Sequence, residues 1–207
     1  MYSNNMFIIG ITGGSGGGKT SALRALENLG ALVLDCDAIY HRLLSDNTGL
    51  KSELADRFPG VLHNGVIDRK QLGDTVFRDP LALDDLNKIT HRYIGAEIER
   101  EIADFRASGG KVAAIDAIAL IESGRSRRCD VVVGVIAPKE LRISRIMARD
   151  GISREQAELR INAQKPDSFY RKNCDHILEG IYDTSQEFEE ICKDFFGKLI
   201  GGITIAG

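Results

Sequence analysis

The 207-residue chain lacks the cysteine pairs and long apolar runs that mark several classes of protein. Its four cysteines (Cys36, Cys129, Cys174 and Cys192) form no C-x-x-C pair, which argues against a zinc site or a redox motif. The apolar run that starts at Met6 is too short to cross a bilayer and has no basic segment before it. We therefore expect neither a signal peptide nor a membrane partner, and a cytoplasmic protein with free thiols.

An excess of positive charge is also absent. The 27 Lys and Arg residues against 30 Asp and Glu give a net charge of -3, which argues against a dedicated nucleic-acid binder. Hydrophobic residues make up 43% and charged residues 28%, as in an ordinary globular protein. We expect one domain over residues 1–207, a monomer or weak oligomer without a nucleic-acid partner.

Apolar segments suited to buried strands alternate with segments of helical periodicity. The five strand candidates are residues 6–12, 32–35, 111–116, 130–137 and 176–178. Residues 38–109 have a helical pattern without a comparable strand signal. This order predicts an α/β fold with a five-stranded, mainly parallel sheet and helices on both faces. Ligands of such sheets bind at the carboxyl ends of the strands.

A glycine-rich segment, "GGSGGGKTS", connects the first strand candidate to a helical segment. It satisfies the GxxxxGK(S/T) pattern, whose backbone N–H groups bind phosphate oxygens at a helix N-terminus. The predicted nucleotide-binding residues are Gly13, Gly14, Ser15, Gly16, Gly17, Gly18, Lys19, Thr20 and Ser21. Lys19 is expected to reach the β and γ phosphates, and the Thr20 hydroxyl to ligate Mg²⁺. A purely structural turn is the less favoured alternative.

The remaining motifs favour a small kinase over other phosphate-loop proteins. No NKxD-type guanine motif occurs, and a motor or recombination ATPase would need a longer chain. A kinase needs an acceptor site, a base and a lid that excludes water. We therefore expect the P-loop kinase fold, with a helical acceptor region at residues 38–109 and a helical lid at residues 138–172.

Two carboxylates, Asp35 and Asp37, follow the second strand candidate. In an extended segment both side chains would point to the same side. One could accept a hydroxyl proton while the other holds Mg²⁺ through water. The alternative is that Asp37 only caps the helix that starts at Ala38.

Three arginines of the lid candidate, Arg142, Arg145 and Arg149, recur at helical spacing. Guanidinium groups on one helix face could neutralise the charge of a transferring phosphoryl group. The alternative is a solvated charged face, because Asp150 and Glu155 lie nearby in the sequence.

With these motifs in order, the chain from about Phe7 to Phe196 resembles the dephospho-CoA kinase family. "GITGGSGGGKTS" is similar to the family's "GLTGGIGSGKST", "LVLDCDAIYHRLL" to its "vIDADxIaR", and "IDAIALIESG" to its "ldiPLLfEsg". The resemblance implies ATP-dependent phosphorylation of the ribose 3′-hydroxyl of dephospho-CoA, the last step of coenzyme A biosynthesis, with Mg²⁺. Spacing alone leaves two alternatives: a kinase of another nucleoside or nucleotide, and a non-enzymatic, nucleotide-gated binding module.

The resemblance also implies roles for individual residues. Asp37 stands at the position of the family's catalytic base, with Lys19 and Arg145 as the other catalytic residues. Arg145 and Arg149 occupy the lid's nucleotide-binding positions, and Gln164 closes that segment. The acceptor-binding positions are Asp37, Arg69, His91 and Glu122; Asp35 or Asp116 would hold Mg²⁺ through water beside Thr20.

Two of these residues could instead have a structural role without a binding function. Arg69 follows Asp68, which could cap a helix and leave the arginine on the surface. His91 on a helix could be a structural histidine.

The chain departs from the family pattern at several positions. Ile118, Ala119 and Leu120 replace the family's Pro-Leu-Leu, and Gly180 stands at an asparagine near the adenine edge. In the phosphate loop, Ser15 and Gly17 each replace the residue usual in the family. In the lid, Arg142 replaces a glutamine. A side-chain contact to the ATP base is therefore expected to be missing at position 180.

Overall fold

The computed structural model describes residues 6–204 of the chain, so residues 1–5 and 205–207 of the predicted domain lie outside it. It divides into two compact units. One contains residues up to Leu34 and from Phe105 onward, and the other contains residues 35–104.

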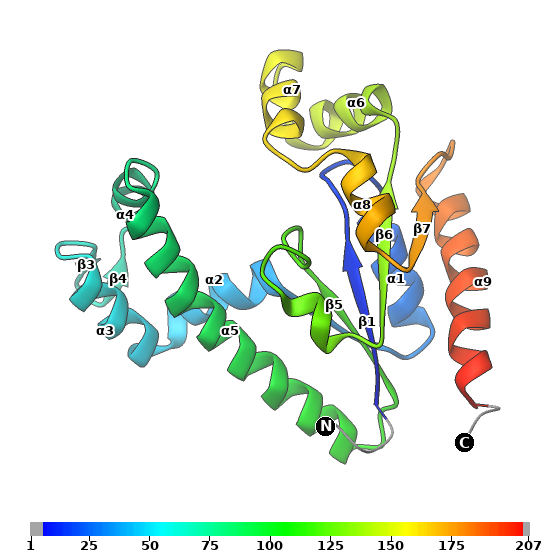
Figure 1. Cartoon of the computed structure of the whole chain (residues 1–207), viewed down its shortest axis with the longest axis horizontal. Helices are drawn as coiled ribbons and strands as arrows, with labels where there is room; N and C mark the ends of the chain where they lie inside the picture. The colour runs from blue at the N-terminus through cyan, green and yellow to red at the C-terminus, as the bar shows by residue number, and fades with distance from the viewer. Residues whose placement is uncertain (1–5, 205–207) are drawn as a thin grey trace. The chain divides into compact units, whose positions relative to one another are not determined.

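The first unit is built on a five-stranded sheet with the order β2-β5-β1-β6-β7 (Figure 1). The strands are β1 (Phe7–Thr12), β2 (Leu32–Asp35), β5 (Val112–Asp116), β6 (Val131–Ile136) and β7 (His176–Glu179). β1 pairs in parallel with β5 and β6, and β6 pairs in parallel with β7. All five strands predicted from the apolar segments are therefore confirmed, to within a residue or two at their ends.

Two helices cover one face of this sheet, α1 (Lys19–Asn28) and α9 (Ser185–Thr204). Ile9 and Ile11 of β1 pack there in one core cluster with Leu26 of α1 and Phe188 of α9. The alternate residue Gly10 faces the other side, where a Cβ atom would lie 2.7 Å from Leu120. The period-2 alternation of a strand thus places β1 between two packed layers.

The opposite face is covered by the segment after β5 and by α8 (Asp167–Asn173), which contacts β6 and β7. The segment after β5 contains a short 3₁₀ helix, Arg125–Arg128. The lid candidate contains α6 (Lys139–Asp150) and α7 (Arg154–Asn162), joined at Gly151 as the sequence predicts. Ile143, Ile146, Ala157 and Ile161 pack these two helices together.

The second unit is mainly helical, as predicted for residues 38–109. Its helices are α2 (Cys36–Asp46), α3 (Thr48–Arg57), α4 (Arg69–Val76) and α5 (Pro80–Ala107), whose last turn continues into the first unit. The expectation that no strand interrupts the helices is wrong, because β3 (Leu62–His63) and β4 (Val66–Ile67) form an antiparallel hairpin. Asn64 and Gly65 at its turn both have positive φ, at 49° and 78°. An Asn-Gly pair is a strong hairpin signal, so the sequence did contain the information.

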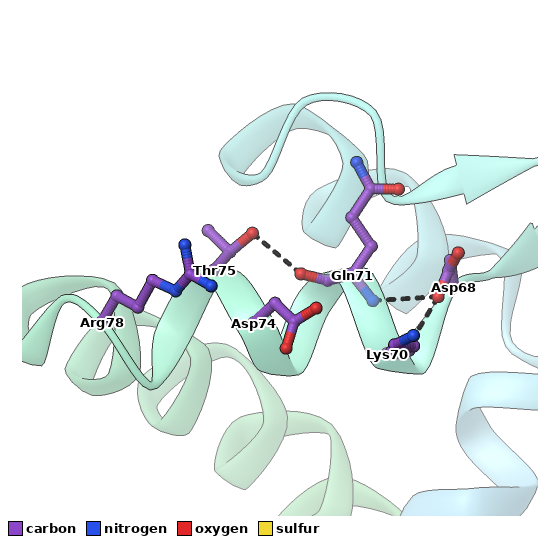
Figure 2. Close-up of a pocket in the computed structure, with 6 residues that line it drawn as sticks. All are labelled: Asp68, Lys70, Gln71, Asp74, Thr75 and Arg78. Atoms are coloured by element: carbon purple, nitrogen blue, oxygen red, sulfur yellow. Dashed lines mark hydrogen bonds between the residues drawn. The ribbon is translucent and has the colours of Figure 1, made fainter.

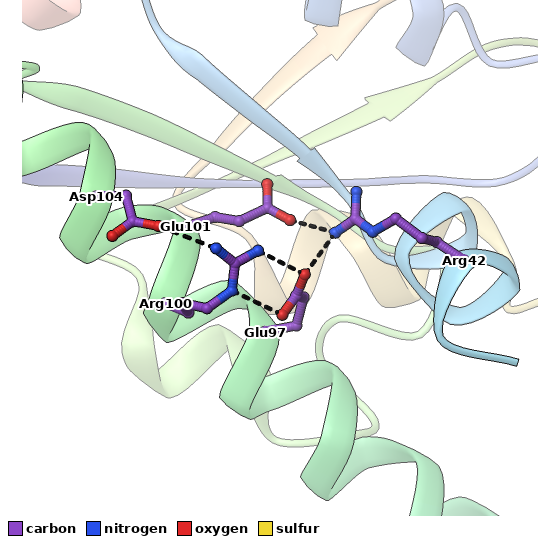
Figure 3. Close-up of polar contacts among 5 residues, drawn as sticks. All are labelled: Arg42, Glu97, Arg100, Glu101 and Asp104. Carbon is purple, nitrogen blue, oxygen red and sulfur yellow. Dashed lines mark hydrogen bonds and ion pairs between the residues drawn. The ribbon is translucent and has the colours of Figure 1, made fainter. Parts of the chain in front are cut away.

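A cluster of charged side chains, the α2–α5 charge cluster, joins two helices of the second unit (Figure 3). Arg42 of α2 donates hydrogen bonds to Glu97 and Glu101 of α5. Arg100 donates to both carboxylate oxygens of Glu97, at 2.8 and 3.0 Å, and to Asp104 at 3.0 Å. Glu97 therefore lies between two guanidinium groups: that of Arg42 joins α2 to α5, and that of Arg100 belongs to α5 itself.

Among the described residues, the helices include none with both the length and the apolar character of a membrane span.

Candidate active site

The phosphate loop, residues 13–21, connects the carboxyl end of β1 to α1. Gly13, Gly16 and Gly18 have φ values of 137°, 76° and 110°, a region that residues with a Cβ atom rarely adopt. Gly14 and Gly17 have ordinary φ values, but a Cβ atom at Gly17 would lie 2.6 Å from the carbonyl oxygen of Val135. The glycines are thus required for two different reasons, backbone conformation and close packing.

The first turn of α1 contains Lys19 and Thr20, the loop residues predicted to contact the phosphates and Mg²⁺. The N–H groups of Lys19 and Thr20 are among the first of the helix and have no acceptor within it. The Lys19 amine donates to the carbonyl of Gly13 at 3.3 Å, and the Thr20 side chain is exposed. The helix terminus, the ammonium group and the hydroxyl form the donor set that a magnesium-bound polyphosphate requires.

Two side chains from outside the loop bind its residue Ser15. Arg142 Nε donates to the Ser15 carbonyl at 2.9 Å, and the Arg142 side chain is buried. Gln164 Oε1 accepts from the Ser15 N–H at 3.0 Å and from Arg142 at 2.8 Å. Arg142 is therefore engaged by protein groups, and burial lowers the pKa of its guanidinium.

Arg145 lies one turn further along α6. It donates to the carbonyls of Gly16 and Gly180, at 3.1 and 2.9 Å, and its guanidinium stacks 3.8 Å from the ring centre of Tyr182. Tyr182 in turn stacks on Phe188 at 4.8 Å. The predicted catalytic and nucleotide-binding Arg145 is thus held directly at the phosphate loop.

Arg149, predicted to bind the nucleotide, makes a different contact. Its guanidinium pairs with both oxygens of the adjacent Asp150, at 2.7 and 3.0 Å, and its side chain is 58% exposed. Arg160 also bonds to Asp150, and the two arginines lower the pKa of that carboxyl to about 2. In this part of α6 the structure has the solvated charged face considered as the alternative.

The local geometry of Asp35 and Asp37 differs from the sequence expectation. The segment is not extended, because α2 begins at Cys36, directly after β2. The helix cap is Asp35, whose Oδ1 accepts from the N–H groups of Asp37 and Ala38 at 2.8 and 3.0 Å. Asp37, the predicted base, therefore lies in the first helical turn with its exposed carboxylate outside the capping bonds.

The other acceptor residues of the second unit, Arg69 and His91, are both exposed. Arg69 is the first residue of α4, and Asp68 caps that helix by accepting from Lys70 and Gln71. An open pocket of about 370 Å³ lies along α4 (Figure 2). Its lining residues are Asp68, Lys70, Gln71, Asp74, Thr75 and Arg78, so it contains neither predicted acceptor residue.

Glu122 and Asp116, from the segment that ends and follows β5, belong to the first unit. Asp116 is half-buried at the end of β5, opposite Ile11 of β1. Glu122 is exposed, and its charge adds to burial in raising the pKa of Tyr170 to about 12. Within the described residues, the Tyr170 hydroxyl is buried without a hydrogen-bond partner. The replaced Pro-Leu-Leu segment is fixed by Thr12, whose hydroxyl donates to the Ile118 carbonyl at 3.0 Å.

Comparison with known proteins identifies the family. A model of the dephospho-CoA kinase family matches residues 7–185. The chain belongs to the dephospho-CoA kinase family. Dephospho-CoA kinase from Dehalococcoides mccartyi is 42% identical over 165 residues, which are 79% of this chain and 83% of that relative.

Solved structures agree with this membership. A crystal structure from Thermus thermophilus has a TM-score of 0.80 at 32% identity and covers 95% of this chain and 99% of its own. The structure of dephospho-CoA kinase from Campylobacter jejuni has a TM-score of 0.68 at 26% identity and covers 94% and 98%. The P-loop kinase fold predicted from the sequence is confirmed.

Gly180 and Gly17, two positions at which this member of the dephospho-CoA kinase family departs from the family pattern, lie next to each other in the structure. A Cβ atom at Gly180 would lie 2.0 Å from the carbonyl oxygen of Gly17. The Gly180 carbonyl also accepts from Arg145. The backbone at position 180 is thus part of the phosphate-loop packing, a role that the sequence comparison alone did not reveal.

Sequence reasoning missed Tyr170 and Tyr182. Neither belongs to a motif, because both act through packing between segments that are distant in sequence. An apolar or aromatic pattern does not distinguish such residues from ordinary core positions.

The predicted magnesium donors carry oxygen atoms, the ligand type that this ion prefers. Thr20 offers a hydroxyl, and Asp116 and Asp35 offer carboxylates at the ends of β5 and β2. Within residues 6–204 there is no group of three His, Cys, Asp or Glu side chains suited to a metal. Mg²⁺ in kinases is commonly bound by one or two protein oxygens together with water and substrate phosphates, so it needs no such group.

Proposed function

We propose that this protein phosphorylates the ribose 3′-hydroxyl of dephospho-CoA with ATP, giving coenzyme A and ADP in the last step of coenzyme A biosynthesis. The observation that most supports this proposal is the complete phosphate loop at the N-terminus of α1, in a chain whose family match spans residues 7–185. The fold and the family membership support the kinase activity.

In the proposed reaction, the 3′-oxygen attacks the γ-phosphorus and the bond from that phosphorus to the β–γ bridging oxygen breaks. Asp37 accepts the proton of the attacking hydroxyl. Lys19 and the α1 N-terminus bind the phosphates, and Arg145 neutralises charge that develops on the transferring group. Arg149 exchanges its bond to Asp150 for the nucleotide.

Thr20, and Asp116 or Asp35 through water, would hold Mg²⁺, which would neutralise charge on the phosphate oxygens. Arg69, His91 and Glu122 are proposed to bind the acceptor. Their exposed side chains support this, since a ligand can reach them.

One assay separates this proposal from its alternatives. The purified protein is incubated with ATP, Mg²⁺ and dephospho-CoA, with nucleosides and nucleoside monophosphates in parallel reactions. The expected product is coenzyme A, detected by mass spectrometry as a phosphate gain at the 3′ position. Transfer to another acceptor would support a different kinase, and ATP binding without transfer would support a nucleotide-gated binding module.

A cytoplasmic location and a monomeric or weakly associating state remain predictions. Cell fractionation and analytical ultracentrifugation measure them.

A further inference from the structure

Two side chains that lie far from the phosphate loop in sequence bind its residue Ser15. Arg142 comes from the second turn of α6, and Gln164 follows α7. The two residues bracket the outer part of the predicted lid, so both ends of that part are attached to the loop.

Every polar group of Ser15 is engaged by this pair. Its carbonyl accepts from Arg142 Nε at 2.9 Å, and its N–H donates to Gln164 Oε1 at 3.0 Å. Its hydroxyl accepts from Gln164 Nε2 at 2.8 Å. The peptide groups on both sides of Ser15 therefore have a defined orientation.

Arg142 also bonds to Gln164 and lies near Asp167. Arg142 Nη2 donates to Gln164 Oε1 at 2.8 Å, and Nη1 lies 3.5 Å from a carboxylate oxygen of Asp167. Only 4% of the Arg142 residue is exposed. A buried guanidinium is costly unless its donors are satisfied, and here they are satisfied largely by the loop and its partner.

Steric fit adds an independent observation. A Cβ atom at Gly14 would lie 2.1 Å from Arg142 Nη2 and 2.8 Å from Gln164 Oε1. The φ of Gly14 is not in the left-handed region, so backbone strain does not demand a glycine there. The pair demands it, because the guanidinium occupies the space beside the loop.

We propose that Arg142 and Gln164 are positioning residues for the donor nucleotide, which hold residues 14–16 in the conformation that receives the polyphosphate. This rests on the proposed function for the identity of the donor. The guanidinium of Arg142 is engaged by Ser15, Gln164 and Asp167, so this proposal gives it a positioning role in place of the phosphoryl clamp expected from the arginine spacing. Without the Arg142 side chain the loop must become ordered when ATP binds, and the free-energy cost of that ordering lowers the affinity for ATP.

The experiment compares Arg142→Lys and Gln164→Leu with the wild type. Lysine keeps the positive charge but cannot bond to Ser15 and Gln164 as a fork, and leucine keeps much of the volume of Gln164 without its hydrogen bonds. Each variant is expected to raise the dissociation constant of a non-hydrolysable ATP analogue with Mg²⁺ about tenfold, measured by calorimetry. The KM of the acceptor stays within about twofold of the wild type.

Arg154→Lys is the matched control. Arg154 begins α7 and pairs with Glu140 and Glu158 on the surface, without touching the loop. It should leave analogue binding unchanged. Circular dichroism establishes that each variant is folded, and Gly14→Ala, which displaces the pair without removing it, should weaken analogue binding in the same way.

The proposal is overturned if folded Arg142→Lys and Gln164→Leu bind the analogue as tightly as the wild type. It is equally overturned if the acceptor KM rises as much as the analogue dissociation constant, because that pattern indicates general loosening. Failure of the wild type to phosphorylate dephospho-CoA would refute the proposed function and leave the analogue-binding test intact.

Discussion

Gly180 is a glycine because of the space around it. Its φ is not in the left-handed region, so another residue could adopt its backbone conformation. The 2.0 Å separation between a Cβ atom there and the Gly17 carbonyl excludes a side chain without backbone movement. Because Gly17 belongs to the phosphate loop, a change at 180 acts on the nucleotide site.

Gly180→Ala is expected to lower the free energy of unfolding by about 1–3 kcal/mol, since overpacking forces the backbone apart. It should also weaken binding of an ATP analogue. Urea unfolding and calorimetry measure the two effects. Gly197→Ala is the control: in α9, with nothing within 4 Å of the added atom, it should stabilise the protein by about 0.5–1 kcal/mol. Equal stability of the two variants would contradict the steric argument.

Asp37→Asn should lower kcat by about two orders of magnitude or more, because an amide cannot accept the hydroxyl proton. ATP-analogue binding should survive, since the phosphate loop is unchanged. Steady-state kinetics with dephospho-CoA give the first quantity and calorimetry the second. Asp56→Asn removes an exposed carboxylate of α3 and serves as the control. Unchanged turnover in Asp37→Asn would remove Asp37 from the role of base.

Sequence reasoning was sufficient for residues whose chemistry follows from a motif and insufficient for residues whose role follows from contacts. Lys19 and Thr20 could be placed at a helix N-terminus from the loop pattern alone. The separate environments of Arg142, Arg145 and Arg149 could not be predicted from the sequence. Helical periodicity indicates which side of the helix a residue is on, but it does not indicate which group the side chain contacts. Only the fold shows that the first is buried against Ser15 and the last faces Asp150.

At the scale of elements, the α2–α5 charge cluster contains the ion pairs that join α2 to α5. Arg100, and then Arg42, lower the pKa of Glu97 from its ordinary value. Its contribution to stability is therefore present above the ordinary glutamate pKa of about 4.3 and is lost as the pH falls through the lowered value. The cluster stabilises the second unit most at neutral and alkaline pH.

Glu97→Gln should reduce the free energy of unfolding by about 0.5–1 kcal/mol at neutral pH, a size typical of networked surface pairs. The difference should shrink in about 1 M salt, because the charges are screened. Urea unfolding at low and high salt measures both. Glu190→Gln should have little effect at either salt concentration, because the Glu190 side chain is 73% exposed and its carboxylate lies 3.8 Å from the Lys193 amine. A salt-independent loss in Glu97→Gln would indicate lost packing instead of lost charge pairing.

The strands were predictable because strands buried on both faces form continuous apolar runs. The β3–β4 hairpin was missed because two-residue strands are too short for alternation to appear, although Asn64-Gly65 signals the turn. The start of α2 was misplaced because Asp-Cys-Asp fits both an extended segment and a capped helix. The capping bonds of Asp35 favoured the helix.

At the scale of the whole molecule, all four cysteines lie within the described residues, and none of them forms a disulfide there. Burial, with a smaller effect from a neighbouring carboxylate, raises the pKa of Cys174 to about 11 and of Cys192 to about 12. In the unfolded chain both thiols would ionise near about 8.5. Their contribution to stability is complete below that pH and is lost as the pH rises towards 11–12.

Cys174 and Cys192 should therefore resist a thiolate-specific reagent at about pH 8 in the native protein, because the thiolate is the reactive form. In concentrated guanidinium chloride all four thiols should react. Mass spectrometry of the labelled peptides identifies the sites, and urea unfolding at about pH 7 and about pH 10 should show lower stability at the higher pH. Rapid native labelling of Cys192 would contradict its burial.

The strand order also sets the sequence of events when the chain is synthesised. β1 is made first, yet its neighbours begin at Val112 and Val131, more than a hundred residues later. Pairing across such separations closes long loops and is intrinsically slow. The phosphate loop leaves the ribosome early but acquires its support only when Gln164 has emerged. Premature release of a truncated chain would therefore leave an apolar strand and the nucleotide loop without partners, a substrate for chaperones and proteases.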